Sequence, residues 1–284
     1  MGATEKPAGP VRPSAIAGSW YPGDAPAIRA EVDRYLADVP GTPLPGRLIG
    51  LIAPHAGLRY SGPVAAHSYA TLRGRPRLVA VLVGPSHRAA FHGVALYARG
   101  AFETPLGRAG VDEATAARLL EGSGVVMADD RPHRLEHSLE MQLPFLQHVV
   151  PDLRIVPLLM GNQVREEIDA LAAVLARVAG TPDVVLIASS DLSHYHPAEV
   201  ANRLDAQVVA EVEALRPEGL MDLLERSHEH ACGGGPMVAV MKASRAAGAR
   251  AARVLRYADS GDAGERDKSR VVGYLAAALL APSP

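Results

Sequence analysis

Histidine and aspartate side chains that can bind metal ions or transfer protons follow several apolar segments of this chain. His55 lies in the motif APHAG, His87 in GPSH, and Asp191 and His194 in SSDLSH. Each motif comes directly after a short run of valine, isoleucine and leucine. Imidazole and carboxylate groups serve as metal ligands and as general acids or bases. We therefore expect these four side chains to form one site if the apolar runs are strands of one sheet.

The chain has a single cysteine, Cys232, in the segment HACGGGP at residues 230–236. An apolar stretch over 237–247 follows it and predicts a helix with Pro236 in its first turn. One cysteine forms no internal disulfide, so its thiol is either buried and inert or chemically employed. The positive end of the helix dipole would favour the thiolate, and the glycines would let the backbone approach a ligand. We expect Cys232 to belong to the same site.

Five apolar runs have the composition of parallel strands that are buried on both faces of a sheet. They are residues 48–53, 78–83, 154–160, 184–189 and 252–258. Between them, apolar residues at spacings of three and four, as in 28–36 and 164–175, predict helices. A chain that alternates in this way is expected to be α/β, with a mostly parallel twisted sheet flanked by helices on both faces. Ligands of such sheets bind beyond the carboxyl ends of the strands, where the candidate residues would meet.

The pattern along the chain predicts a single α/β domain over residues 1–284. The 284 residues are 48% hydrophobic, which is enough for a large core, and no linker interrupts them. The first 12 residues are rich in proline and glycine, so we expect them to be flexible. The polar stretch 261–268 predicts a loop before a last strand-like run, 270–280.

The distribution of charge and hydropathy argues against several partners. A net charge of −2 comes from 29 basic and 31 acidic residues that are interspersed, without a block of lysine or arginine. Nucleic acids and anionic membranes are therefore not expected as partners. No apolar run approaches the roughly 20 residues of a membrane-spanning helix, and the N-terminus lacks the apolar core of a signal peptide. We expect a cytoplasmic protein.

Two further segments carry residues whose role has alternative interpretations. In EHSLEMQLPF, His137 and Glu140 could form a metal pair, but nothing orients them toward the strand ends, which favours a supporting or capping role. In SWYPGD, Trp20 and Tyr21 lie in a segment too polar for a core. They would form either a lid over the sheet edge or an aromatic wall for a ligand.

Signature motifs of several enzyme classes are absent from the sequence. It contains no glycine-rich dinucleotide fingerprint, no phosphate loop ending in GK[ST], no GxSxG, no HExxH and no CxxC. Nucleotide-driven, serine-hydrolase and zinc-protease chemistries therefore lose support.

Taken together, the motifs resemble those of the Memo family. They are APHAG, GPSH, EHSLEMQLP, SSDLSH, the CGxxP of residues 232–236, and RYADSG followed by SRVVGYLAAAL, and the likeness runs from about Ser14 to Leu280. Bacterial and archaeal members are often named as a component of the AmmeMemoRadiSam system, beside a radical-SAM protein and an AMMECR-type protein. The family's fold is similar to that of class III extradiol dioxygenases, which cleave catechol rings at non-haem iron. The resemblance implies this fold, and these partners, for the chain.

The resemblance also implies a metal site. His55, His87 and Cys232 match the family's metal-binding positions, and Asp191 and His194 line the same pocket. In the dioxygenases two histidines and a glutamate hold the iron, so Cys232 takes the place of the carboxylate. A thiolate is a softer donor than a carboxylate, and it favours copper, zinc or a redox-active iron. This departure argues against ring cleavage.

Three functions agree with these residues. The first is a metal-dependent oxidoreductase that uses iron or copper, with His194 as general base and Asp191 orienting it. The second is a binding or assembly component whose pocket recognises a small molecule, a peptide or a partner protein without turnover. The third is a dioxygenase-like fold with an empty pocket. We take the first as the leading hypothesis.

Overall fold

Four parallel strands form the centre of the sheet, in the spatial order β8, β3, β9 and β2. The computed structural model describes residues 9–41, 43–227, 229–263 and 267–283. The central strands are β8 (Asp152–Met160), β3 (Arg77–Pro85), β9 (Val184–Ser189) and β2 (Arg47–Ala53). They are rich in branched aliphatic residues that are almost all buried, as in sheets covered on both faces. Four of the five apolar runs of the sequence are thus confirmed as central parallel strands.

Both edges of the sheet include antiparallel pairs. Beside β2 lies β12 (Val271–Ala281), which pairs antiparallel with β2, with β10 (Asp191–His196) and with β11 (Ala251–Asp259). Beyond β8 lie β6 (Gly107–Val111), β5 (Ala101–Thr104), β1 (Val11–Arg12), β4 (Val94–Leu96) and β7 (Val126–Ala128). The expectation of a mostly parallel sheet is confirmed, with antiparallel strands added at its borders.

The last strands correct the expectation that strands and helices alternate throughout. The run 252–258 does form β11, but this strand is antiparallel and partly exposed instead of parallel and buried. The physical reason is that, among the described residues, only the 3₁₀ turn Ser260–Ala263 is assigned between β11 and β12, without the crossover helix that usually returns a chain for parallel pairing. Likewise β10 follows β9 after one residue, Ser190, without an intervening helix.

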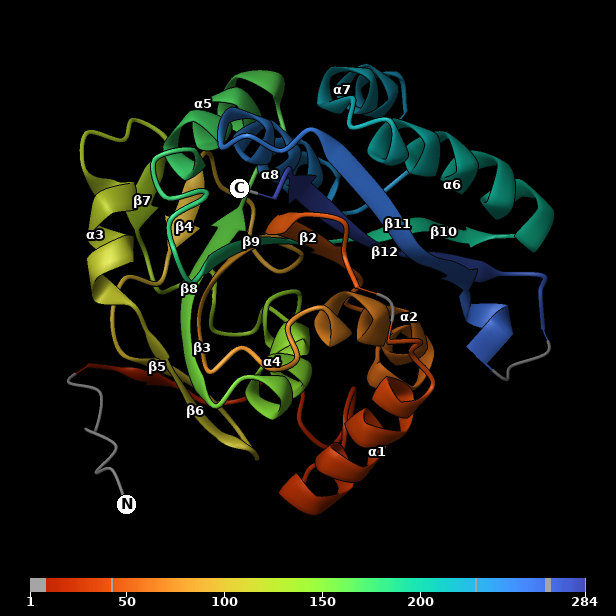
Figure 1. The fold of residues 1–284 in the computed structure, drawn as a ribbon, viewed down its shortest axis with the longest axis horizontal. Helices are drawn as coiled ribbons and strands as arrows, with labels where there is room; N and C mark the ends of the chain where they lie inside the picture. Colours follow the sequence, from red (N-terminus) through yellow and green to blue (C-terminus); the bar gives the residue numbers. More distant parts are fainter. Residues whose placement is uncertain (1–8, 42, 228, 264–266, 284) are drawn as a thin grey trace.

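Helices cover both faces of the sheet, as expected (Figure 1). One layer contains α1 (Ala25–Ala37), α2 (Leu58–Ala70) and α4 (Leu143–Val149), and the other contains α5 (Arg165–Leu175), α6 (Ala198–Glu213), α7 (Pro217–Arg226) and α8 (Gly234–Ala246). The short α3 (Glu113–Leu120) lies near β7 at the far edge. Among the described residues, no helix combines the length and the apolar character needed to span a membrane.

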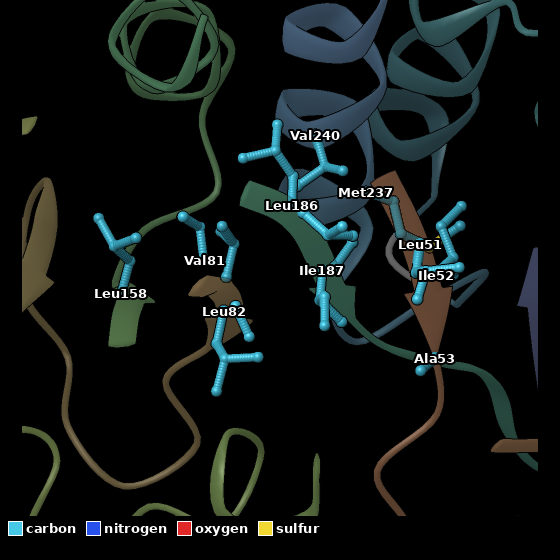
Figure 2. Close-up of a cluster of buried hydrophobic side chains, with 14 of the residues drawn as sticks. Leu51, Ile52, Ala53, Val81, Leu82, Leu158, Leu186, Ile187, Met237 and Val240 are labelled. Carbon is cyan, nitrogen blue, oxygen red and sulfur yellow. The ribbon is translucent and has the colours of Figure 1, made fainter. Parts of the chain in front are cut away.

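The core between α8 and the central strands is formed by aliphatic side chains. Figure 2 shows Met237 and Val240 of α8 directed at Leu186 of β9 and Leu51 of β2. All four side chains are completely buried. Each large apolar side chain buried in this way contributes roughly 1.5–3 kcal/mol. This packing fixes the strands, and therefore the positions at which their carboxyl ends deliver polar residues.

The start of the chain is more ordered than we expected from its composition. Residues 1–8 lie outside the described part, so the predicted flexibility is not assessed there. Val11 and Arg12, however, form β1, which pairs in parallel with β5. Arg12 is buried at 3% exposure. The expectation of a flexible segment therefore does not extend to these two residues, because Arg12 has a buried anionic partner that lies far away in the sequence.

Candidate metal centre

A cavity of about 800 Å³ lies beyond the carboxyl ends of the central strands. His55 follows β2 and His87 follows β3, while Asp191 and His194 lie on β10. His137 belongs to the irregular segment before the 3₁₀ helix η1 (Glu140–Gln142). All five residues line the cavity. The fold thus brings together the polar residues of three strand ends, although Asp191 and His194 lie on a strand and not in a turn that leads to a helix.

Three of these imidazoles form a cluster. His55, His87 and His137 each offer one ligand atom, and these atoms all lie within 4.8 Å of one another. The ring centroids of His87 and His137 are 4.5 Å apart, and that of His55 lies 5.2 and 5.5 Å from theirs. His55 and His137 are buried, whereas the side chain of His87 is 29% exposed. The sequence favoured a supporting role for His137, but His137 lies inside the cluster and offers a ligand atom of its own.

The tautomer of His55 follows from the hydrogen bonds of Ser189. The Ser189 hydroxyl donates its one proton to the carbonyl of Ser138 at 2.7 Å, and it accepts a hydrogen bond from Gln142 Nε2 at 2.7 Å. It also lies 2.8 Å from His55 Nδ1, so the imidazole must be the donor in that pair. His55 therefore carries its proton on Nδ1, which leaves a lone pair on Nε2.

His87 is oriented by a buried carboxylate, Glu136. The Nδ1 atom of His87 lies 2.9 Å from Glu136 Oε1, and its backbone N–H donates to Oε2. Burial alone would raise the pKa of Glu136, but the hydrogen bond and charge of His87 and the N–H of Ser138 hold that pKa well below its usual range. An ionised carboxylate only accepts, so His87 donates from Nδ1, and Nε2 is the nitrogen that faces away from this carboxylate bond.

The buried imidazoles of the cluster are neutral at pH 7. Burial first, and then the proximity of His87, holds the pKa of His55 well below its ordinary value. Burial lowers the pKa of His137 to about 4, although the charge of Glu136 opposes this shift. The Nδ1 atom of His137 lies 3.2 Å from Glu136 Oε1 and is buried without a hydrogen-bond partner among the described residues. Neutral imidazoles with free lone pairs are the protonation state that a metal ion requires.

Cys232 lies beside His55. Its Sγ atom is 3.3 Å from His55 Nε2, the nitrogen that carries the lone pair, and 3.6 Å from the backbone carbonyl oxygen of Asp191, so the one thiol proton has two acceptors within reach. Burial, together with the nearby carboxylate of Asp191, raises the pKa of the Cys232 thiol. The expectation that a helix dipole would favour the thiolate is thus wrong for the protein without a metal ion, because desolvation outweighs the dipole.

The glycines after Cys232 serve packing. A Cβ atom on Gly233 would lie 2.3 Å from the carbonyl oxygen of Ser189, and one on Gly234 would lie 2.4 Å from the side chain of Leu224. The helix α8 begins at Gly234, so Pro236 lies in its first turn, as the sequence predicts. We expected these glycines to admit a ligand, but they instead allow α8 to approach the end of β9 and the helix α7.

Asp191 and His194 have separate partners. The Asp191 carboxylate accepts hydrogen bonds from the backbone N–H groups of His55 at 2.7 Å and Ala56 at 3.3 Å. Burial raises its pKa to about 6, although the hydrogen bond from His55 opposes the shift. His194 instead donates from Nδ1 to the carbonyl of Leu192 at 2.8 Å. The expected orienting bond from Asp191 to His194 is therefore wrong: Asp191 holds the His55 loop, and a backbone carbonyl orients His194.

Trp20 and Tyr21 contribute to the wall of the cavity. The ring centroid of Trp20 lies 4.4 Å from that of His137, and the hydroxyl of Tyr21 donates to Glu140 Oε1 at 2.7 Å. Asp24, at the end of the same motif, caps α1 by accepting from the N–H of Ala27. The motif SWYPGD is thus both an aromatic wall and a staple that attaches the N-terminal segment.

Glu140 lies behind this wall and does not line the cavity. It is completely buried, and its carboxylate accepts from the guanidinium of Arg12 and from the hydroxyl of Ser14 at 2.6 Å. Arg12 also donates to the backbone carbonyls of His133 and Glu136. Glu140 therefore neither pairs with His137 nor lines the pocket. It anchors the first strand beneath the histidine segment, which is the supporting role that the sequence favoured.

Three supporting residues were not identified from the sequence. They are Glu136, Ser189 and Gln142, which hold His87 and His55. Ser189 and Glu136 lie inside the motifs SSDLSH and EHSLEMQLP, so their motifs were visible but their roles were not. An acceptor or donor role depends on groups far apart in the chain, and no local pattern encodes it.

Comparisons with known proteins agree with the motifs. A family model described as Memo-like protein matches residues 12–278. A MEMO1 family protein of Methanothermobacter thermautotrophicus is 38% identical over 275 residues, which is 93% of this chain and 98% of that protein. Another MEMO1 family protein, from Methanopyrus kandleri, is 38% identical over 277 residues, which is 93% of this chain and 97% of that protein.

A solved structure shares the fold. An uncharacterised protein of Escherichia coli K12 superposes with a TM-score of 0.54 at 15% sequence identity, covering 81% of this chain and 99% of that one. At this identity the likeness concerns the fold alone. The family model and the two relatives each match nearly the whole of this chain, including the residues that carry its histidine motifs. This chain therefore belongs to the Memo family.

Proposed function

We propose that this protein is a metal-dependent oxidoreductase whose iron or copper ion is held by His55 and His87. The observation that carries the proposal is the convergence of three imidazoles in one cavity, with their ligand atoms within 4.8 Å of one another. The tautomers of His55 and His87 are set by Ser189 and Glu136, which is the arrangement found around metal-ligating histidines. A bound iron or copper ion would supply one-electron redox chemistry.

Cys232 is the third ligand in this proposal. Its Sγ atom lies 3.3 Å from His55 Nε2, so the two become adjacent donors once the thiol releases its proton. Because the pKa of the thiol is raised in the protein without a metal ion, binding should release a proton and weaken as the pH falls. His137 is the competing third donor, since it completes the cluster without any loss of a proton.

His194 is the proposed general base. Its Nδ1–H donates to a carbonyl, which leaves the Nε2 lone pair free to accept a proton from a substrate in the cavity. The cavity volume of about 800 Å³ is within the range of small-molecule sites. Trp20, Tyr195 and Tyr274 line it and offer flat contact surfaces for a substrate.

The first experiment is metal analysis by mass spectrometry on protein purified without chelators or affinity metal. We expect near-stoichiometric iron or copper, which His55→Ala and His87→Ala each abolish. Cys232→Ala should also abolish tight binding, whereas His137→Ala should retain it. The matched control is His92→Ala, because His92 is 87% exposed and lies outside the cluster.

Each deviation has a defined meaning. If His137→Ala loses the metal and Cys232→Ala keeps it, the site is a three-histidine centre and the assignment of Cys232 is wrong. If the wild-type protein binds no metal even after anaerobic reconstitution, the oxidoreductase proposal fails and the cavity is a recognition pocket. With metal bound, oxygen consumption or copper reduction in the presence of a catechol or a thiol tests turnover.

A further inference from the structure

A second cavity, of about 610 Å³, lies at the opposite ends of the elements that form the histidine site. It includes Arg47 at the start of β2 and Ala70 at the end of α2, whereas His55 and Leu58, at the other ends of these elements, line the first cavity. The loop between α1 and β2 and part of β11 complete it. The two cavities share no lining residue.

The second cavity is strongly basic. Arg47, Arg73, Arg75 and Arg253 line it together with His67, and its described lining contains no aspartate or glutamate. The net charge of the whole chain is −2, so this concentration of positive charge is local. Four cations around one hollow repel each other unless an anion lies among them.

These arginines lack anionic partners among the residues that the structure describes. Arg47 donates to the carbonyl of Gly180 at 3.2 Å and Arg73 to that of Leu36 at 2.6 Å. Arg253 donates to the carbonyl of Pro43 at 3.4 Å. Carbonyl groups hold a guanidinium in place but leave its charge uncompensated, and its remaining N–H groups can bind an anion bidentately.

His67, which also lines the cavity, lies within the influence of a further arginine. Burial first, and then the charge of Arg256, lowers the pKa of its imidazole. Arg256 does not itself line the cavity, and its charge also acts on Asp262, so the proposal rests on the four lining arginines.

The inner surface of the cavity is apolar. Leu48 is buried, and Val254 and Leu255 are half-buried. Together with Val39 and Leu44 they form a surface suited to a flat or apolar group. A ligand that fits both parts of the cavity carries a polyanionic group and an apolar body.

We propose that this cavity binds a small organic phosphate, such as a nucleoside diphosphate. Guanidinium groups match phosphate oxygens in geometry and charge, and the volume is that of a small-molecule site. A concave hollow of this size favours a compact ligand over the extended backbone of a nucleic acid. The inference is independent of the proposed metal chemistry, because no residue of the histidine cluster takes part.

Isothermal titration of the full-length protein tests the proposal with three probes: pyrophosphate, ADP and adenosine. Pyrophosphate and ADP should bind, ADP more tightly because of its apolar body, and adenosine should not. The double variant Arg73→Ser/Arg253→Ser should weaken ADP binding about 100-fold, since each hydrogen bond to a charged group contributes roughly tenfold or more. His55→Ala should bind ADP as the wild type does.

The matched control is Arg203→Ser/Arg216→Ser, which removes the same charge from arginines that pair with Glu199 and Glu211 elsewhere. Equal loss in the control, or unchanged ADP binding in the cavity variant, would overturn the proposal. An oligonucleotide that binds more tightly than ADP would also overturn it, in favour of a nucleic-acid surface. Should the cavity variant misfold by circular dichroism, hydrogen exchange of the wild type decides: ADP must protect residues 43–48 and 70–75.

Discussion

The two halves of the histidine cluster are supported by different kinds of interaction. The imidazole of His55 is held by neutral groups, through Ser189 and Gln142, and Gln142 in turn accepts from the hydroxyl of Tyr69; the Asp191 carboxylate contacts only the backbone of the His55 loop. His87 and His137 are held by a segment that contains two buried carboxylates, Glu136 and Glu140. The neutral half belongs to the sheet and its helices, whereas the charged half is an irregular segment tied to the N-terminal strand.

The difference shows where the site is vulnerable. Removing one member of a neutral hydrogen-bonded chain lowers the free energy of unfolding by about 1 kcal/mol. Removing one partner of a buried ion pair lowers it by about 3–5 kcal/mol. Glu140 is completely buried, and Arg12 is the cation that compensates its charge. We therefore expect the charged half to respond more strongly to substitution and to acid than the neutral half.

The largest expected effect is that of Arg12→Met. It leaves the Glu140 carboxylate buried without its cation, so the free energy of unfolding should fall by about 4 kcal/mol. Urea unfolding measures this loss. Arg108→Met is the control, because its pair with Glu103 is exposed and should contribute less than about 1 kcal/mol. A similar loss in both variants would contradict the contrast between the buried and the exposed pair.

The next effect concerns pH and His133, which packs beside Arg12 in the charged half. Burial lowers its pKa from 6.5 to about 4. Above pH 6.5 His133 is neutral in both the folded and the unfolded chain. As the pH falls from 6.5 to 4, the unfolded chain takes up a proton that the folded protein excludes, so about 3 kcal/mol of stability should be lost.

The control for this effect is His133→Gln, which keeps an N–H donor for the carbonyl of Ala95 but does not titrate. Urea unfolding at pH 7, 6, 5 and 4 should show a smaller decline for the variant than for the wild type. Parallel curves would mean that His133 is solvated or protonated in the folded protein.

A third prediction concerns Glu136→Gln. The amide can still accept from His87 Nδ1, but without the negative charge the imidazole becomes a weaker donor to a metal ion. The affinity for iron or copper should fall by up to about 100-fold, which is the upper end of the range for removing a group that hydrogen-bonds to a metal ligand. Competition with a chelator measures this affinity. Glu103→Gln, an exposed change of the same kind, should leave the affinity unchanged.

The smallest expected effect is that of Ser189→Ala in the neutral half. It frees the tautomer of His55, and metal affinity should fall about tenfold, the lower end of the same range. Nitrogen-15 NMR of histidine-labelled protein without metal should show His55 protonated only on Nδ1 in the wild type and a mixture of tautomers in the variant. Ser68→Ala, which removes another buried hydroxyl that bonds to the Ile52 carbonyl, should retain the single tautomer. A greater loss of affinity than in Glu136→Gln would reverse the proposed order of the two halves.

The fold was predictable where its causes are local. The segments 48–53, 78–83, 154–160 and 184–189 are continuous aliphatic runs, and all four are central strands. The edges were less predictable. The strand β11 contains Arg253 and Arg256 and is partly exposed, and its antiparallel direction depends on its pairing with β12. Arg12 looked like part of a flexible segment because its buried partner is 128 residues away.

The sequence by itself determined the family, the parallel centre of the sheet, and the strand ends that carry His55 and His87, because these depend on contiguous motifs and local hydrophobicity. Only the tertiary structure decided that His137 completes the cluster, and which nitrogen of His55 and of His87 donates a hydrogen bond. The physical reason is that a tautomer is set by its hydrogen-bond partner. For His55 that partner lies 134 residues away, and for His87 it lies 49 residues away. Such pairs exist only once the chain has folded.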